Sequence, residues 1–553
     1  MIFLDGTSLT LDQLLAISDR REPVGLAPAA ADRVRASRAV VDRQAHGDAP
    51  VYGINTGFGS FAEVKIAPDA LEALQLNLLR SHAAGVGRPL PVRAVRATMA
   101  LRANVLAKGY SGIRVETLEA LLALLNAGVH PRVPSRGSVG ASGDLAPLAH
   151  LSLVLIGEGE ADYADDDRPD VRAGGIEQPS RRRHADDSQP TVRGTGPGTG
   201  TLPAPPPRRA TRMSGADALA RAGLTPVTLG AKEGLALING TQPSTAVLAL
   251  ALAGAAQLAR AADITAALSI DALRGSIHPF EARIHDARPF AGQKTSAANI
   301  ERLLRGSGIN LSHARCGKVQ DAYSLRCAAQ VHGATRDALR FIGETVGVEM
   351  NSATDNPMVF ADPAGGAGEI VSGGNFHGAP IALAADLLAA ALVPIATISE
   401  RRTDRLVNPA LSGLPAFLTR DGGLQSGLMM AQVTAAAVAS ELKTLAHPAG
   451  VDTIPTSANK EDHVSMSMGA ALKAERALTR ARTVVAIELL CACQAIDLLA
   501  PLETSAPLAR VHALVRSRVP TLAGDRAPAP DIDALAALIA SSALEDACGA
   551  RVK

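Results

Sequence analysis

The chain has 553 residues, of which 47% are hydrophobic and only 2% aromatic, and its 55 Lys and Arg balance 54 Asp and Glu. The length predicts two or more domains, and the near-zero net charge gives no electrostatic basis for binding nucleic acid or an anionic membrane. Ala and Leu dominate the hydrophobic residues, and both favour helix, so we expect a mainly α fold.

The cysteines and the apolar segments indicate where the protein works. Five cysteines form neither a disulfide framework nor a zinc-site spacing, so no metal is expected. The N-terminus lacks the pattern of a signal peptide. The longest apolar run, 381–398, contains Asp386 and Pro394. We interpret it as a buried helix, because a charge inside a membrane span is costly, and we expect a cytoplasmic protein.

Residues 1–163 are predicted to form a first domain, which is rich in short helical patterns. These patterns cover 11–18, 28–45, a helix from 69 that ends at Gly85, two helices within 93–127, and 145–156.

The segment Val51–Gly59 interrupts these helices. Its three glycines indicate a loop. Tyr52 in this loop is one of only four tyrosines in the chain. The segment is either a plain surface loop or a cover that carries a phenol over a pocket and excludes water.

The stretch Gly137–His150 contains Ala141-Ser142-Gly143, which can become a reagent made only of backbone. The amide nitrogen of Gly143 can attack the carbonyl of Ala141, and loss of water closes a five-membered ring. Loss of the Ser142 hydroxyl then leaves an exocyclic methylidene, which is an electrophile. Gly143 lets the backbone fold back where a Cβ would clash. The alternative is an ordinary Gly/Ser turn before a helix that starts near Asp144.

The remainder of the chain divides into two parts. Residues 164–213 have almost no apolar content, and disorder is the expected state of such an insertion. Within residues 214–553, long segments are apolar on most faces, and this pattern predicts a helical bundle. These segments are 243–270, 378–398, 424–446 and 468–500.

Two polar groups stand out in this second part. Gln320, Tyr323 and Arg326 recur at a spacing of three, which predicts one shared face on a helix or helical turn. Arg326 is suited to binding a carboxylate bidentately, although an ordinary polar helix face explains the spacing equally well. Glu461 precedes a core helix, and alone it indicates only a solvated or capping residue.

Several blocks taken together resemble the family of histidine and aromatic amino-acid ammonia-lyases, which depend on 4-methylidene-imidazol-5-one (MIO). The resemblance covers nearly the whole chain except 164–213. The run that contains Ser81-His82 is similar to the histidine-specific branch of that family. The blocks are Asn77–Gly87, Gly137–His150, Ala231–Gln242, Lys318–Cys327, Asn351–Pro357, Ser372–Gly378 and Thr456–Met466.

The resemblance implies a long-helix bundle of the ammonia-lyase and fumarase/aspartase-like type, with a smaller N-terminal domain that bears MIO. It implies elimination of ammonia from L-histidine to give urocanate, no external cofactor, and a homotetramer whose active sites are shared between subunits. The implied roles are MIO formation by Ala141, Ser142 and Gly143, lining of the tripeptide by Phe376, contact with MIO or the carboxylate by Asn239, carboxylate binding by Gln320 and Arg326, imidazole contact by His82 and Glu461, and acid–base chemistry by Tyr52 and Tyr323.

Two further expectations concern charge. Free tyrosine has a pKa of about 10, so we expect helix N-termini and nearby cations to lower the pKa of a catalytic tyrosine and to stabilise charge on the MIO oxygen. Lys460 stands where the family often has glutamine, and it could pair with Glu461.

Three alternatives stay open. One is a tyrosine or phenylalanine ammonia-lyase, and another is a 2,3-aminomutase of the same family. The third, from another class, is a catalytically silent helical scaffold.

Overall fold

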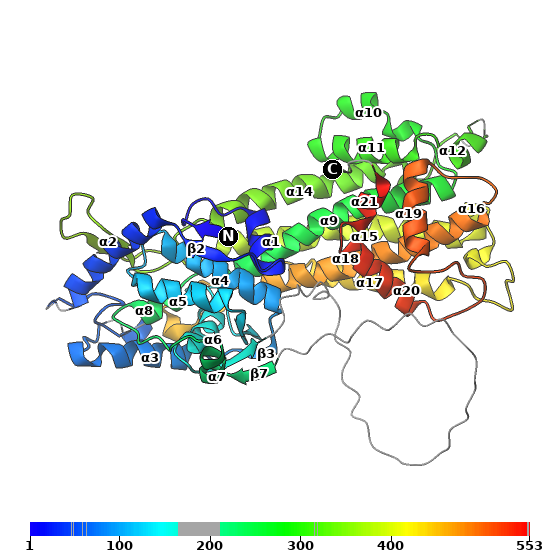
Figure 1. Cartoon of the computed structure of the whole chain (residues 1–553). Coiled ribbons are helices and arrows are strands. Elements are labelled where there is room, and N and C mark those ends of the chain that lie inside the picture. Colours follow the sequence, from blue (N-terminus) through cyan, green and yellow to red (C-terminus); the bar gives the residue numbers. More distant parts are fainter. Residues whose placement is uncertain are drawn as a thin grey trace, which may run out of the picture.

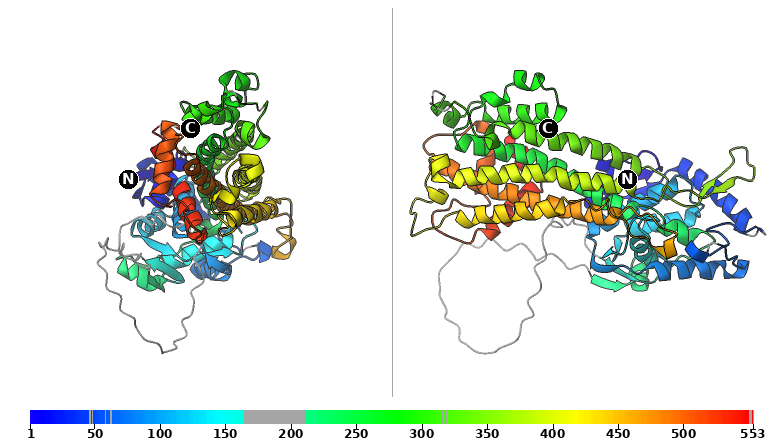
Figure 2. Two further views of the ribbon diagram at one scale, coloured as in Figure 1. Left: turned by 90° about the vertical axis from the view of Figure 1, so that its right-hand side faces the viewer. Right: turned by 180° about the vertical axis from the view of Figure 1, so that it is seen from behind.

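The computed structural model describes residues 1–45, 47, 49–57, 59–61, 63–163, 211–314, 316–317, 319–549 and 552. Figure 1 shows an elongated molecule in which long helices run side by side at one end. The N-terminal helices and small sheets gather at the other end. The views in Figure 2 show the same arrangement end-on and from behind.

The bundle is built from helices rich in alanine, which lets their backbones approach closely. The first of them buries residues on all faces at both of its ends, as expected for a central helix. The long helices are α9 (Gln242–Ala272), α14 (Ala328–Glu349), α15 (Ala379–Val407), α17 (Met429–Leu445) and α18 (Ser467–Leu498). These segments confirm the predicted long helices, although α15 continues nine residues beyond the predicted end and α14 was not singled out.

Helices α9 and α15 are long and apolar enough to cross a membrane by length and composition alone. In each of them the apolar window is mostly buried inside the protein, at 72% and 56%. That burial is typical of core helices, and it agrees with the interpretation of residues 381–398 as a buried helix.

Shorter helices cover the far end and one side of the bundle. They are α10 (Ala282–Asp286), α11 (Ala291–Leu304), α12 (Gly308–Ser312), α13 (Tyr323–Arg326), α16 (Pro409–Ser412), α19 (Ala506–Arg516), α20 (Ala529–Ile539) and α21 (Ala543–Cys548).

The N-terminal body surrounds α4, in which almost every side chain is buried. Its helices are α1 (Leu11–Asp19), α2 (Pro28–Ala45), α3 (Leu71–His82), α4 (Val92–Ala107), α5 (Val115–Asn126), α6 (Leu145–Leu155), α7 (Gly215–Arg221) and α8 (Glu233–Ile238). The helix predicted to end at Gly85 therefore ends three residues earlier, at His82.

The strands are short and form small sheets. β1 (Ile2–Leu4) pairs in parallel with β2 (Val24–Leu26), and the other pairs are antiparallel. They are β3 (Val86–Pro89) with β5 (Pro134–Arg136), β4 (Val129–Pro131) with β6 (Glu160–Tyr163), and β8 (Met358–Phe360) with β9 (Glu369–Val371).

The edges of the predicted insertion differ from expectation. Residues 164–210 lie outside the described residues. Residues 211–213, which were assigned to the insertion, begin β7 (Thr211–Ser214), which pairs with β6 so that Thr211 faces Tyr163. Residues 215–238 then pack as α7 and α8 against α6 and α3 of the N-terminal body. The apolar Met213, inside the strand, packs against the core, which a composition average over the whole insertion could not reveal.

Candidate active site

The loop that contains Ala141-Ser142-Gly143 lies where four helices begin. Helix α6 starts directly after it. The Gly378 amide, just before α15, donates to the Gly140 carbonyl at 3.2 Å, and the Met466 amide, just before α18, donates to the Val139 carbonyl at 2.7 Å. The Asp144 amide donates to Gly240, just before α9, at 2.8 Å. Helix N-termini carry partial positive charge, so those of α6, α9, α15 and α18 contribute positive potential at this loop.

The tripeptide is packed tightly against the corner between α8 and α9. Gly143 is buried with φ +70°, and a Cβ at this position would overlap the Gly240 carbonyl. Asn239 Nδ2 donates to the Ser142 carbonyl oxygen at 3.0 Å. The Gly143 amide donates no hydrogen bond to another described residue. A nitrogen without a competing acceptor, next to the buried Ala141, fits the cyclisation predicted from the sequence.

Glu461 reaches the tripeptide from the loop before α18. Ser142 Oγ donates to Glu461 Oε1 at 2.8 Å, and Thr456 Oγ1 donates to Oε2 at 2.6 Å. Lys460, by contrast, is exposed, and no ion pair with Glu461 occurs within the described part of the chain. The suggested Lys460–Glu461 pair is therefore wrong, because both carboxylate oxygens are directed towards hydroxyl groups.

His82, at the end of α3, lies close enough to Glu461 for the carboxylate charge to affect the pKa of its ring. Its Nδ1 is 2.9 Å from the Leu78 carbonyl oxygen. A carbonyl can only accept, so we infer that Nδ1 carries the proton and that Nε2 is the acceptor of the neutral ring. Burial lowers the pKa of His82, although the Leu78 carbonyl and the Glu461 carboxylate oppose this. The ring is therefore neutral at pH 7.

Tyr52 also lies within the field of Glu461. Burial raises the pKa of its phenol, Glu461 raises it further, and a hydrogen bond with the backbone of Gly59 lowers it in part. The expectation of a lowered tyrosine pKa is therefore wrong for Tyr52 within one chain. The helix N-termini face the tripeptide loop, whereas the phenol is buried beside a carboxylate.

Phe376 lies in the segment just before α15. It is half-buried and is two residues before Gly378, whose amide binds the tripeptide loop. The structure thus brings Asn239 and Glu461 into contact with Ser142 and places Tyr52 and His82 within the field of Glu461, from segments spread over more than 400 residues of sequence.

The other three predicted site residues lie elsewhere. The Ser324 carbonyl in α13 accepts from Arg402 Nη1, and Arg402 follows Gly378 by 24 positions along α15. At 1.5 Å per residue, these 24 positions span about 36 Å along α15, so α13 and the tripeptide of the same chain lie near opposite ends of this helix. Tyr323 is 71% exposed there, and the Arg326 guanidinium lies 4.7 Å from the centre of its ring. Gln320 precedes α13 in an exposed loop, so the predicted shared helical face is wrong for it.

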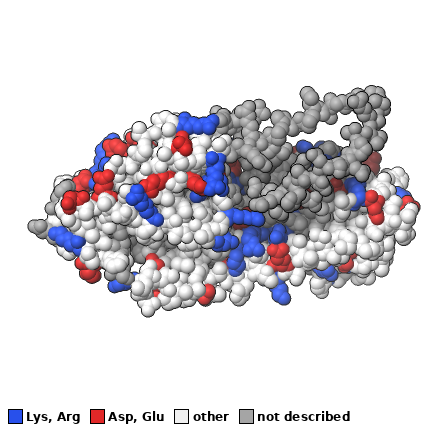
Figure 3. Space-filling view, turned by 90° about the horizontal axis from the view of Figure 1, so that it is seen from below, with Lys and Arg blue, Asp and Glu red and all other residues white. Residues whose placement is uncertain are grey.

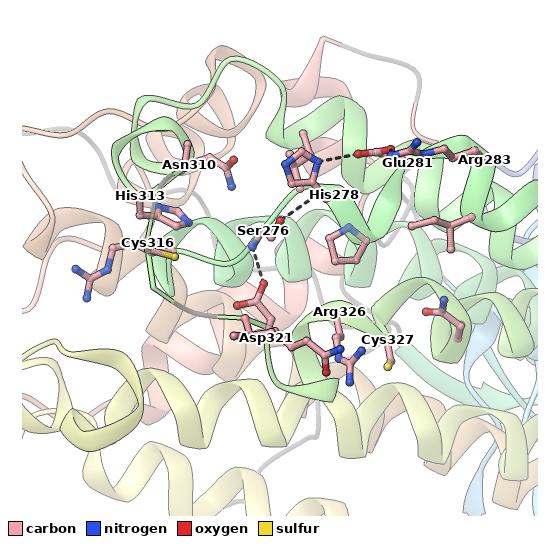
Figure 4. Close-up of a pocket in the computed structure, with 18 residues that line it drawn as sticks. Ser276, His278, Glu281, Arg283, Asn310, His313, Cys316, Asp321, Arg326 and Cys327 are labelled. Carbon is pink, nitrogen blue, oxygen red and sulfur yellow. Dashed lines mark hydrogen bonds and ion pairs between the residues drawn. The ribbon is translucent and has the colours of Figure 1, made fainter.

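Gln320 and Arg326 nevertheless line one open cavity of about 890 Å³. Figure 4 shows this cavity, in which Arg326 lies below His278 and near Asp321. The Ser276 amide donates to Asp321 Oδ2 at 2.6 Å, which fixes the loop before α13. A cationic side chain in an open cavity can bind a carboxylate, but Ser142 of the same chain cannot reach it.

Two residues that the sequence analysis did not assign to the site hold it in place. Asp144, read as a helix-start residue, is fully buried and accepts from Ser138 Oγ at 2.6 Å and from the Ser244 amide at 2.8 Å. Thr456 orients Glu461. The position of Asp144 directly after the tripeptide is a signal that could have found it, whereas nothing local marks Thr456.

Two further observations concern the charge of the surface and the side chains that could bind a metal. Basic and acidic side chains are interspersed over the face shown in Figure 3, outside its grey region. Among the described residues, no three His, Cys, Asp or Glu side chains gather as metal ligands would.

Solved structures of histidine ammonia-lyase, tyrosine aminomutase and phenylalanine aminomutase share this long-helix fold. The family model described as aromatic amino acid lyase matches residues 9–517. The chain belongs to the aromatic amino acid lyase family. This confirms both the family resemblance and the mainly α fold class.

Named relatives lie close in sequence and structure. A histidine ammonia-lyase of Anaeromyxobacter dehalogenans (strain 2CP-C) is 53% identical over 546 residues, which cover 98% of this chain and 99% of that protein. The crystal structure of histidine ammonia-lyase from Trypanosoma cruzi is 42% identical, with a TM-score of 0.84 over 99% of this chain and 95% of that one. Tyrosine aminomutase from Streptomyces globisporus is 35% identical, with a TM-score of 0.85 over 99% of this chain and 98% of that one.

Proposed function

We propose that this protein eliminates ammonia from L-histidine to give urocanate. The observation that carries the proposal is near-full-length identity of about half to relatives named histidine ammonia-lyase. The neighbourhood of Ser142 agrees with it, because His82 and Glu461 offer two hydrogen-bond acceptors suited to an imidazole.

The proposal includes an MIO group made from Ala141, Ser142 and Gly143. Three observations support this. Gly143 is buried, its amide donates no hydrogen bond to another described residue, and Asn239 donates a hydrogen bond to the Ser142 carbonyl. Once formed, MIO supplies an electrophile that makes the substrate amine a better leaving group. The N-termini of α6, α9, α15 and α18 favour negative charge at this point.

The chain's own residues then bind the substrate and move its protons. His82 Nε2 accepts from the imidazole N–H, and Glu461 binds the same ring. A tyrosine takes the β proton, the Cα–Cβ double bond forms, and the C–N bond breaks to release ammonia. The raised pKa keeps Tyr52 protonated at neutral pH in a single chain, so a base role for Tyr52 requires a nearby cation to stabilise its phenolate.

Arg326 can be that cation if a second copy of the chain completes the site. Arg326, Tyr323 and Gln320 lie in or next to α13, near the opposite end of α15 from the tripeptide of their own chain. Apolar side chains are exposed on α14, α15 and α17, and they fit contacts between copies. They are Phe341, Val348, Leu383, Met430 and Val433. We propose a homotetramer in which the cavity beside Arg326 faces the tripeptide of a neighbouring chain and binds the substrate carboxylate.

Complementation tests the shared site. Chains carrying Ser142→Ala and chains carrying Arg326→Ala are each expected to be inactive. Co-expression of the two is expected to restore activity, because some mixed sites combine an intact tripeptide from one chain with an intact Arg326 from another. Mixed oligomers without activity would contradict a shared site.

Product analysis tests the reaction itself. The proposal predicts urocanate and ammonia in equal amounts from L-histidine. A β-amino isomer of the substrate would instead indicate an aminomutase, the class that the tyrosine aminomutase neighbour represents.

The proposed location is the cytoplasm. All five cysteines are unpaired thiols, and Cys491, Cys493 and Cys548 are buried in the core. Free thiols are typical of a reducing compartment. The proposed partner is a small amino-acid substrate.

A further inference from the structure

A buried arginine lies beneath the tripeptide, on the far side of the α8–α9 corner. Arg102 projects from α4, and its side chain is fully buried. Its Nη1 donates to the Asn239 carbonyl at 2.7 Å and to Gln242 Oε1 at 2.7 Å, and its Nη2 donates to the Ala236 carbonyl. One rigid guanidinium thus holds the last turn of α8 and the first residue of α9 together.

The corner that Arg102 holds is the surface on which the tripeptide rests. Asn239 binds the Ser142 carbonyl oxygen, and the Gly240 carbonyl accepts from the Asp144 amide. Gly240 has φ +147°, and a Cβ there would lie 2.7 Å from Arg102 Nη1. The tripeptide, the Gly240 backbone and the guanidinium are therefore packed in three successive layers without room for a methyl group.

The surroundings of Arg102 are fixed as well. Gln242 Nε2 donates to Thr354 Oγ1 at 2.7 Å, and the buried Lys232 pairs with Asp355 at 3.1 Å just before α8 begins. Burial lowers the pKa of Arg102 to about 10, with Asp355 opposing the decrease, so the group is still cationic at neutral pH.

We propose that Arg102 is a positioning residue for ring closure, which sets the Asn239–Gly240 backbone against which Ala141-Ser142-Gly143 cyclises. The inference rests on the proposed MIO function and assigns a residue outside the tripeptide to its formation. In ring closure, a bond forms between the Gly143 nitrogen and the Ala141 carbonyl carbon, and the carbonyl oxygen leaves as water with the protons of the Gly143 and Ser142 amide nitrogens. Ser142 then loses its hydroxyl and its Cα proton as a second water.

Geometry explains why arginine is needed. The attacking nitrogen and the carbonyl carbon must be brought to near contact, and a misplacement of about 1 Å can cost about a hundredfold in rate. A lysine at this position would keep the charge, but its point-like ammonium lacks the planar fork that holds two carbonyls and an amide in one geometry.

The same helix supplies a matched control. Arg96 is six residues earlier on α4, is 3% exposed, and also donates to two backbone carbonyls, those of Ile17 and Leu125, each at 3.0 Å. Burial also lowers its pKa to about 10. It serves the same kind of structural role away from the tripeptide.

The test is the intact mass of the full chain for the wild type, Arg102→Lys and Arg96→Lys, with circular dichroism and Tm measured on each. We expect the wild type and Arg96→Lys to lack two waters. We expect Arg102→Lys to be folded, with a Tm near that of Arg96→Lys, but to lose the waters about a hundredfold more slowly. An Arg102→Lys chain that loses both waters as fast as the wild type would overturn the inference.

Two further measurements separate a failure of the proposed function, or of folding, from a failure of the inference about Arg102. A wild-type chain that keeps both waters contradicts the proposed function rather than the role of Arg102. If Arg102→Lys is insoluble, Gln242→Met removes one acceptor that orients Arg102 while keeping the side-chain volume. Slow loss of water in Gln242→Met supports the inference, and loss at the wild-type rate contradicts it.

Discussion

Ser142 and Glu461, which are 319 residues apart in sequence, are joined by a hydrogen bond of 2.8 Å. The contact brings the residue that must lose its hydroxyl to the carboxylate expected to bind the imidazole. The contact suggests two roles for Glu461, which are binding of the substrate and action on Ser142. Substitution of Glu461 separates them, because the first role changes KM and the second changes ring formation.

Glu461→Gln tests the substrate-binding role. Hydrogen bonds to charged groups contribute about 1.5–3 kcal/mol, so we expect KM for L-histidine to rise about 10- to 150-fold. Intact mass is expected to show normal loss of two waters. Lys460→Gln is the control, because Lys460 is exposed and should leave KM unchanged. A Glu461→Gln chain that keeps a water would instead assign Glu461 to ring formation.

Gly143→Ala tests the close packing of the tripeptide. The added Cβ would overlap the Gly240 carbonyl, so we expect loss of ring formation, measured by intact mass. Gly128→Ala is the matched control, because Gly128 has nearly the same φ, +72° against +70°, with no atom within 4 Å of an added Cβ. Equal damage from both substitutions would show that backbone strain alone is responsible.

His130 predicts how stability depends on pH. Burial, together with Arg96 and Arg21, lowers its pKa to about 3. The unfolded chain takes up this proton at about pH 6.5, whereas the folded chain does not until about pH 3. The contribution of the neutral His130 to the free energy of unfolding is therefore present above pH 6.5 and is lost as the pH falls. Between pH 7 and pH 5 it decreases by about 2 kcal/mol.

The measurement is urea unfolding at both pH values. His130→Phe is expected to lose about 2 kcal/mol less than the wild type over this interval, because the other buried histidines are common to both chains. Equal pH dependence in both chains would be inconsistent with a buried, neutral His130.

Replacement of residues 164–210 by Asn-Gly tests the insertion. Tyr163 and Thr211 are directly paired, so a two-residue turn can join β6 to β7. We expect a folded chain with wild-type activity. Replacement of residues 164–214 also removes β7 and its backbone hydrogen bonds, and we expect lower soluble yield. Loss of activity in the first variant would mean that residues 164–210 contribute to the active protein.

The bundle and most of its long helices could be predicted from the sequence, because segments such as those of α15 and α18 are apolar on most faces over a length typical of helices. A role for the tripeptide could be proposed from the sequence because its chemistry is also local, and that role stays a prediction. The packing of Arg102 under Gly240 could not, since it depends on a contact 137 positions apart that no local pattern encodes. The separation of Arg326 from Ser142 was equally inaccessible, because a spacing of three residues gives the face of a helix but not its place in the fold.

The raised pKa of Tyr52 shows a second limit. The N-termini of several predicted helices meet at the tripeptide. Whether the phenol lies in that positive field or is buried beside Glu461 is a matter of a few ångströms, and only the three-dimensional arrangement determines it.

The most direct test of the central claim is ultraviolet absorbance of the purified protein with L-histidine, beside L-tyrosine and L-phenylalanine, for the wild type and Ser142→Ala. We expect growth of the urocanate band with L-histidine alone, and loss of that band in Ser142→Ala. A cinnamate-type band from tyrosine or phenylalanine without a urocanate band, or full activity in Ser142→Ala, would contradict it.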